Sequence, residues 1–173
     1  HPDSLFLVDE AYGEFASVEA AGLEVLYGLE EPCVRGRAGL LGDLTWETCA
    51  AALNAASLAP LACRSPNIVV SRTFSKAFGL AALRVGYAVG RPDVIRAIRV
   101  APSPKAVSGA AVRAARAALR ELPYYLLSTV GTREDAREVV RGLRSAGWFV
   151  RDTPGNFFLV YVGAPTAPVV EAL

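Results

Sequence analysis

The chain is poor in the residues that build most metal centres and hydrolytic triads. Its only histidine is His1, and its three cysteines, Cys33, Cys49 and Cys63, lack the close pairs of a zinc site. A zinc hydrolase and a Ser-His-Asp hydrolase are both disfavoured, because each needs a histidine in its site. We therefore expect no metal centre, and the odd number of cysteines favours a reduced, cytoplasmic setting.

Long apolar runs and an excess of one charge are also missing. No apolar stretch reaches about 18 residues, which argues against a membrane span. The net charge is +1 with 20% charged residues, and nothing in that balance points to nucleic acid. With 53% hydrophobic residues over 173 positions, the chain can bury a sizeable core and is typical of a globular protein.

Methionine is absent altogether, and the ends of the chain are abrupt. The sequence begins with His-Pro and enters the strand-like run "SLFLVDE" within four residues. It stops at "APVVEAL", which is typical of the start of a helix. We interpret the chain as an internal piece of a longer protein.

Short apolar runs alternate with helical patterns along the first hundred residues, which predicts an α/β fold with a mostly parallel sheet. A new pair of runs after Gly147 predicts the start of an α+β unit. The predicted strands are 4–8, 67–71, 85–89, "WFVRD" and 156–162. The predicted helices are 45–59, 92–100, 105–121 and 123–146.

Two segments carry expectations of their own. Residues 17–44 hold five glycines and a proline, which favours an irregular excursion over a long regular element. The helix 123–146 has one apolar face and one charged face, and we interpret the charged face as solvated. Its members are Arg133, Glu134, Arg137, Glu138, Arg141 and Arg144.

Polar side chains follow two of the predicted strands. Asp9 and Tyr12 come after the first strand, and Ser71, Thr73 and Lys76 come at the end of the second. In open α/β sheets ligands collect at the carboxyl ends of strands, so the two clusters meet in one crevice if their strands share a sheet.

The chemistry of these side chains points to one kind of ligand. A carboxylate such as Asp9 can hold a protonated ring nitrogen, and Tyr12 can donate to a phenolate-type oxygen. The small Ala11 between them leaves room for a flat ring. Lys76, held out of water beside the cationic Arg84, would be the neutral amine that forms a Schiff base.

A phosphate group completes the set. Thr73 and Ser75 supply hydroxyl groups and Arg84 supplies a guanidinium fork, which are the donors that phosphate prefers. Pyridoxal 5′-phosphate carries the pyridinium, phenolate, aldehyde and phosphate that these groups require together. Gly79, Gly86 and Gly90 do not form a G-x-G-x-x-G pattern, so a nicotinamide site is disfavoured.

The segments "DEAYGEF" and "NIVVSRTFSKAFGLAALRVGYAVG" closely resemble the fold-type I pyridoxal-phosphate aminotransferases of class I/II, most of all the histidinol-phosphate aminotransferase group. The later "PSPKAVSGAAVRAARAAL" and "DTPGNFFLVYV" also resemble the family, so the likeness runs from residue 1 to about 162. The resemblance implies that Lys76 forms the Schiff base and that Asp9 and Tyr12 contact the cofactor ring. It implies that Thr73, Ser75 and Arg84 bind the phosphate; we add Asn156 as a weak substrate-binding candidate, with a turn role as its alternative.

The resemblance also implies a domain layout. Residues 1–103 would be the C-terminal part of the cofactor-binding large domain, 104–146 connecting helices, and 147–173 the start of the small domain. Asp9 and Lys76 lie 67 positions apart, farther than is usual in the family, so 17–44 is interpreted as an insertion. The family's earlier half and its later carboxylate-binding arginine would lie outside this chain.

The implied function is transamination of an amino donor with a 2-oxo acid in a homodimer. The preferred substrate pair is histidinol phosphate with 2-oxoglutarate, and the alternatives are an aromatic amino acid aminotransferase or a threonine-phosphate decarboxylase. Two other classes stay open: a non-catalytic relative, and a P-loop ATPase fragment, because "LFLVDEA" is also typical of a magnesium-binding strand. The chain lacks the G-x-x-x-x-G-K-[ST] loop that the ATPase needs.

Overall fold

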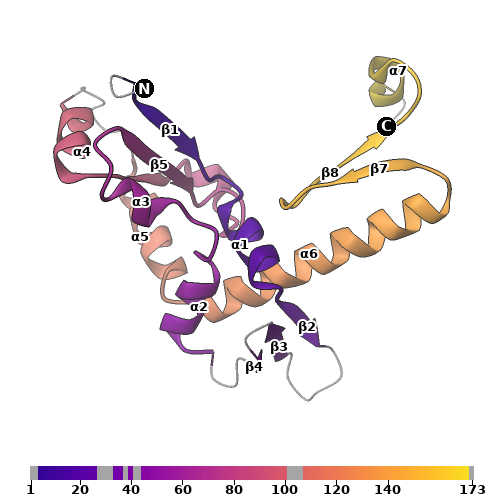
Figure 1. Ribbon diagram of the computed structural model, residues 1–173, viewed down its shortest axis with the longest axis horizontal. Helices are drawn as coiled ribbons and strands as arrows, with labels where there is room; N and C mark the ends of the chain where they lie inside the picture. The colour runs from indigo at the N-terminus through magenta and orange to yellow at the C-terminus, as the bar shows by residue number, and fades with distance from the viewer. Residues whose placement is uncertain (1–3, 27–32, 37–38, 41–43, 101–106, 172–173) are drawn as a thin grey trace.

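The computed structural model describes residues 4–26, 33–36, 39–40, 44–100 and 107–171. Its main sheet has the strand order β1-β5-β6, formed by β1 (Phe6–Asp9), β5 (Ile68–Thr73) and β6 (Gly86–Val89) (Figure 1). β1 and β5 are parallel, and Asp9 is the register partner of Ser71. The two strands therefore end side by side, as the polar clusters required.

β6 differs from the expected parallel arrangement. It pairs with β5 antiparallel, with Thr73 opposite Gly86. The connection is a tight reversal through the short 3₁₀ turn η1 (Ala81–Leu83), closed by hydrogen bonds from Phe74 N to Val85 O (3.1 Å) and from Leu80 N to Phe74 O (2.8 Å). A parallel neighbour would need a crossover, usually helical, and this connection contains none.

Most predicted helices are present, with shifted ends. α4 (Pro92–Arg99) begins at its predicted proline, and α6 (Leu122–Ser145) spans the predicted long helix. α5 (Gly109–Ala118) begins with a Ser108 cap, and residues 101–106 lie outside the described part of the chain.

The predicted helix 45–59 is wrong beyond its first half. It is α2 (Trp46–Ala52), started by the Thr45 cap, and a separate short helix α3 (Ala59–Ala62) follows. The side chain of Asn54 donates to Ala50 O (2.6 Å) and Ser57 N donates to Asn54 O (3.0 Å), so local turns replace the helical ladder.

The expectation of an irregular segment at 17–44 is also wrong for its described residues. α1 (Gly13–Ala21) crosses position 17 and ends at Gly22, whose φ of 62° is left-handed. A small antiparallel sheet follows in the order β2-β3-β4, made of β2 (Glu24–Leu26), β3 (Cys33–Gly36) and β4 (Gly39–Leu40). Gly36 and Gly39, two of the glycines that favoured irregularity, are paired with each other across β3 and β4.

The core lies between the main sheet, α1, α2, α5 and the first half of α6. Its central side chains include Leu53, Phe74, Phe78, Leu122 and Leu126. Phe78 is buried and packs on Phe74 with ring centroids 5.0 Å apart. This core fixes the loop that carries Lys76, because Phe74 and Phe78 flank it on both sides.

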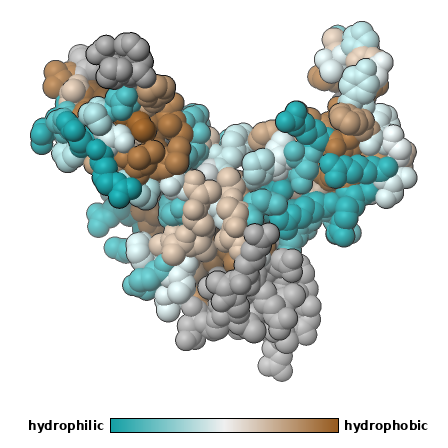
Figure 2. Space-filling model, viewed as in Figure 1, coloured by the Kyte–Doolittle hydropathy of each residue, from teal (hydrophilic) through white to brown (hydrophobic). Residues whose placement is uncertain are grey.

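The second half of α6 leaves this body and carries a smaller arm (Figure 1). The arm is a hairpin of β7 (Phe149–Asp152) and β8 (Phe158–Tyr161), followed by α7 (Thr166–Glu171). Figure 2 shows hydrophobic surface both on the body around the main sheet and on this arm. Exposed apolar side chains include Leu5, which precedes β1, and Leu7 on β1. On the hairpin they include Phe149, Leu159 and Tyr161. The turn of the hairpin points back toward α1 and the end of β1.

The charged face of α6 is only partly solvated. Arg133 is 2% exposed and lies against α1 and the hairpin, which contradicts its assignment to a solvated face. Arg141 and Glu138 are exposed as expected. The difference arises because the hairpin folds back over the first part of that face, a contact that helical periodicity alone does not report.

Candidate active site

The carboxylate of Asp9 sits at the end of β1 and is fixed by two donors. Its Oδ1 accepts a hydrogen bond from Ala11 N at 3.0 Å and from Ser71 Oγ at 3.3 Å. The second donor comes from the neighbouring strand β5, so the parallel register itself orients the carboxylate. Asp9 is exposed, which leaves its other oxygen free for a ligand.

A second polar group lies at the end of β5. Thr73 Oγ1 accepts from Ser75 N at 3.1 Å and lies 2.9 Å from Ser75 Oγ, so the two hydroxyl groups are adjacent. Arg84 Nη1 lies 3.5 Å from Ser75 Oγ and donates to Ala81 O at 2.9 Å. Two hydroxyl groups and one guanidinium are therefore gathered at one place, as a phosphate site requires.

Arg84 has an unusual backbone. Its φ is 49° and its ψ is 52°, and it is the sole non-glycine residue with positive φ in the described part of the chain. Such a conformation costs about 1 kcal/mol or more for a residue with a Cβ and is often found at binding sites. Here it ends η1 and turns the arginine back toward Ser75.

Lys76 joins the two groups. Its Nζ lies 5.3 Å from the centroid of the Tyr12 ring, within the range of a cation–π contact. The motif after β1 and the motif after β5 therefore face one another, although Tyr12 and Lys76 lie 64 positions apart in the sequence. The expectation of a lysine held out of water is wrong, however, because the Lys76 side chain is exposed and the Tyr12 ring covers only one side of it.

Glu10 has a structural role at the end of β1. Its carboxylate accepts from Leu58 N at 2.7 Å and from Ser57 Oγ at 2.8 Å, on the side of the strand away from Asp9. These bonds tie the end of β1 to the turn before α3. Asp9 is therefore fixed in two ways: Ser71 donates a hydrogen bond to its side chain, and the next residue, Glu10, is hydrogen-bonded to Ser57 and Leu58.

Arg72 is a buried residue that sequence reasoning missed. It is 5% exposed, and its Nη2 lies 2.9 Å from Glu14 Oε1 while its Nε lies 3.6 Å from Glu10 Oε2. Burial raises the pKa of Glu14, and the Arg72 charge offsets this only in part. The alternation of side chains along a strand could have predicted this burial. Ser71 and Thr73 face the side of Asp9 and Ser75, so Arg72 must face the opposite side.

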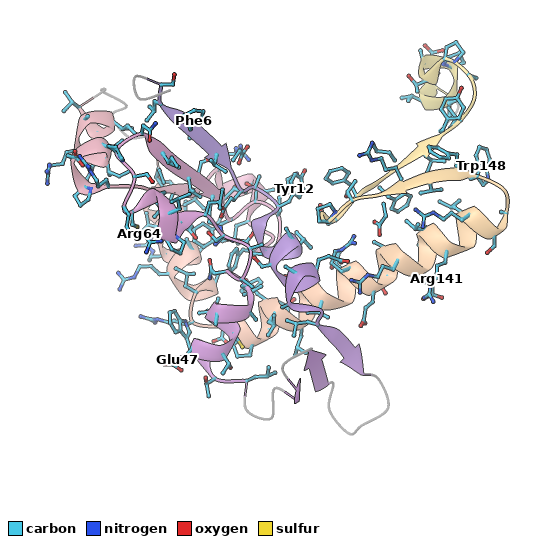
Figure 3. All side chains as sticks on the ribbon, viewed as in Figure 1. Phe6, Tyr12, Glu47, Arg64, Arg141 and Trp148 are labelled. Carbon is cyan, nitrogen blue, oxygen red and sulfur yellow. The ribbon has the colours of Figure 1, made fainter. Side chains whose placement is uncertain are left out.

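The tip of the hairpin reaches the same edge of the sheet as Tyr12 and Lys76. The Phe157 ring meets the Tyr12 ring edge-on, with centroids 5.1 Å apart. Figure 3 shows Tyr12 at the start of α1 on the side that faces this tip. Asn156 is exposed beside Phe157 and makes no hydrogen bond to the described residues, so its role in substrate binding stays a prediction.

The residues present fit pyridoxal 5′-phosphate by the chemistry of the donor set. An oriented carboxylate is available for a pyridinium nitrogen, a phenol for a phenolic oxygen, and an amine for an aldehyde. Two hydroxyl groups and a guanidinium are available for the phosphate. Five of these six side chains come from two neighbouring strand ends, where α/β folds bind ligands, and Arg84 comes from the end of the turn η1.

Among residues 4–23, 44–100 and 107–171, no three His, Cys, Asp or Glu side chains gather as a metal site would require. None of the helices described is both long enough and apolar enough to cross a bilayer.

The fold and the donor set fit the class of fold-type I pyridoxal-phosphate proteins, and comparison with known proteins narrows this class. The sequence profile named "Aminotransferase class I and II" matches residues 2–172. The chain belongs to the class I and II aminotransferase family. This membership confirms the predicted family and removes the P-loop ATPase alternative.

Curated relatives carry two different names. A histidinol-phosphate aminotransferase of Pseudomonas fluorescens is 40% identical over 108 residues, which cover 62% of this chain and 29% of the relative. An aromatic amino acid aminotransferase of Thermobifida fusca is 45% identical over 108 residues, which cover 62% and 30%. The chain therefore matches less than a third of the length of these relatives.

Solved structures confirm the fold. The histidinol-phosphate aminotransferase of Sinorhizobium meliloti, solved with pyridoxal 5′-phosphate, superposes with a TM-score of 0.68 at 23% identity and covers 96% of this chain and 36% of its own. A second such protein, from Erwinia carotovora, gives a TM-score of 0.62 at 22% identity, covering 94% and 38%. The predicted division into domains 1–103, 104–146 and 147–173 stays a prediction.

Proposed function

We propose that the protein of which this chain is a part transfers an amino group from an amino donor to a 2-oxo acid, with pyridoxal 5′-phosphate bound at Lys76. The observation that carries the proposal is the meeting of the two motifs, with Lys76 Nζ 5.3 Å from the Tyr12 ring. Bound to an enzyme, this cofactor supplies an electron sink for the carbanion formed at the substrate α-carbon. The other tasks fall to side chains of the chain.

Lys76 has two tasks in this proposal. Its amine would hold the cofactor by condensing with the aldehyde, with loss of water, and once displaced by an amino donor it would be free to take the α-proton as general base. Its exposure is compatible with both tasks, because the amine must swing between two partners. The Tyr12 ring limits that movement from one side.

The remaining residues bind and orient. Asp9 keeps a proton on the ring nitrogen, and its fixed Oδ1 leaves Oδ2 to accept that hydrogen bond. Tyr12 donates to the phenolic oxygen, and Ala11 leaves space for the ring. Thr73, Ser75 and Arg84 hold the phosphate.

For the substrate, we propose histidinol phosphate with 2-oxoglutarate. Support comes from the likeness to proteins named histidinol-phosphate aminotransferase in both kinds of comparison. An aromatic amino acid aminotransferase is the second candidate, favoured by relatives with that name. Both donors present a ring beyond the reacting amine, so turnover of the two by the full-length enzyme decides between them. The homodimer and the cytoplasmic location stay predictions.

The decisive experiment uses the chain's small number of lysines. The sequence contains only Lys76 and Lys105, so borohydride reduction of the cofactor-loaded full-length protein followed by peptide mass analysis has two sites to distinguish within this region. We expect the reduced cofactor on the Lys76 peptide alone. The variant Lys76→Arg should lose the visible absorption band and the transaminase activity, whereas the matched control Lys105→Arg should keep both.

Two results would contradict the proposal. A wild-type protein with no absorption band would favour the non-catalytic relative. A Lys76→Arg variant with normal turnover would show that another amine performs the chemistry.

A further inference from the structure

Among the residues that the structure describes, Arg133 is the most deeply buried charged residue. It lies in the middle of α6 and is 2% exposed. Its Nε and Nη2 each donate to Glu19 Oε2 at 3.2 Å, its Nη1 donates to Gly155 O at 2.8 Å, and its Nη2 lies 3.4 Å from Asp152 Oδ2. A buried guanidinium is strongly destabilising unless partners of this kind accept its hydrogen bonds. The positions of Glu19, Gly155 and Asp152 therefore depend on Arg133.

The three partners belong to two separate parts of the fold. Glu19 lies on α1, the helix that starts directly after Tyr12. Asp152 ends β7, and Gly155 lies in the turn between β7 and β8. Arg133 therefore connects the helix behind Tyr12 to the turn of the hairpin.

That turn is packed directly against Tyr12. Phe157 meets the Tyr12 ring at 5.1 Å between centroids. A Cβ added at Gly155 would lie 2.8 Å from Phe157 Cε1 and 3.5 Å from Tyr12 Cδ1. The packing has no spare room, and a displaced turn would move the Phe157 ring on Tyr12.

We propose that Arg133 is a positioning residue for the active site: by holding Glu19 and the 153–157 turn together, it seats Phe157 against Tyr12 and fixes the direction of the Tyr12 hydroxyl. This rests on the proposed function, in which that hydroxyl donates to the phenolic oxygen of the cofactor. Arg133 touches neither cofactor nor substrate in this scheme. It acts through the Gly155 carbonyl and the Phe157 ring.

The geometry determines which variants test the proposal. Arg133→Lys keeps the charge but loses the fork, and one ammonium cannot reach Glu19, Asp152 and the Gly155 carbonyl together. Gly155→Ala leaves Arg133 intact, but the added Cβ displaces the Phe157 ring directly. Both variants should therefore disturb the contact between Phe157 and Tyr12. Arg141→Lys is the matched control, because Arg141 is exposed on the same helix and takes no part in these contacts.

The first measurement needs no cofactor. Amide hydrogen exchange in residues 153–157 reports whether the turn is held, because the Thr153 and Gly155 amides are bonded within it. We expect Arg133→Lys to speed exchange there by about tenfold, the value of one charge-assisted hydrogen bond, with no change for Arg141→Lys. Equal exchange in the two variants would overturn the proposal.

The second measurement is spectroscopic and uses the cofactor-loaded full-length protein. A donor to the phenolic oxygen favours the deprotonated form of the bound cofactor, so a misdirected Tyr12 should raise the pH midpoint of the visible band. We expect an upward shift of about half a pH unit or more for both Arg133→Lys and Gly155→Ala, less than additive in the double variant.

The outcomes separate the two proposals. An unchanged midpoint in both variants, with faster exchange in Arg133→Lys, would show a purely structural clamp and overturn the positioning role. A wild-type protein without the band would overturn the proposed function and the catalytic relevance of Arg133 with it. The exchange measurement would still decide whether Arg133 holds the turn.

Discussion

Replacing Arg72 by methionine isolates the ion network behind the crevice. Methionine fills the path of the arginine stem with an unbranched apolar chain, so the change removes the charge more than the packing. The variant leaves the carboxylates of Glu10 and Glu14 without their cation, at side-chain exposures of 9% and 3%. Removing one partner of a buried ion pair costs about 3–5 kcal/mol, and we expect Arg72→Met to lose this much in the free energy of unfolding.

The loss should depend on pH with a defined sign. Burial already raises the pKa of Glu14, and removal of Arg72 takes away the charge that offsets it. A carboxyl with a raised pKa is most costly to the fold when ionised, and the cost disappears once the pH falls below that pKa. The difference between wild type and Arg72→Met should therefore be larger at pH 8 than at pH 5, as measured by urea unfolding at both values.

A double-mutant cycle supplies the control. Glu14→Gln removes the buried negative charge, so the double variant should be more stable than the sum of the two single losses predicts, by about 1 kcal/mol or more. The reasoning would be refuted by an Arg72→Met variant that loses less than about 1 kcal/mol, or by strictly additive losses, since either shows that the network contributes little.

Two further predictions concern other parts of the fold. A Cβ on Gly86 would lie 2.5 Å from the Arg72 carbonyl oxygen, so Gly86→Ala should destabilise the protein by about 1–3 kcal/mol. Gly142 has open space around it, so Gly142→Ala should stabilise α6 by about 0.5–1 kcal/mol. Thermal unfolding of both variants tests the contrast, and equal effects would contradict it. For Glu19, burial alone would raise the pKa, but hydrogen bonds and charge from Arg137 and Arg133 outweigh it and lower the pKa. Its stabilisation is present above about pH 4.5 and is lost as the pH falls below that value. At 38% side-chain exposure, solvent screening limits the loss in Glu19→Gln to about 1 kcal/mol at pH 7, and we expect almost none at pH 3 in denaturant titrations.

The placement of the crevice could be predicted because its determinants are local. Each polar cluster directly follows an apolar run, and parallel strands of one sheet bring their carboxyl ends to one edge. The register of β1 on β5, with Asp9 opposite Ser71, fulfils this expectation. Lys76 and Tyr12 meet for the same reason, because each directly follows one of these two strands.

Burial of single side chains could not be predicted in the same way. Arg133 and Arg141 occupy equivalent places in the charged pattern of α6, yet the hairpin covers the first and leaves the second exposed. Lys76 was expected out of water, but its exposure depends on which elements enclose the strand ends, and here the side chain is exposed with the Tyr12 ring 5.3 Å from its Nζ. Both differences are set by tertiary neighbours rather than by periodicity.

Arg72 connects the placement of the strand ends with the burial of single side chains, because the alternation of side chains along β5 decides which face of the sheet it occupies. Ser71 and Thr73 face the crevice, so the residue between them must face the opposite side, where Glu14 and Glu10 receive it. A slip of β5 by one residue would bring Arg72 into the crevice and bury the hydroxyl groups that the phosphate needs. The buried ion network therefore selects the register in which Asp9 meets Ser71, and the same strand that presents the cofactor donors on one face is held in place by charge on the other.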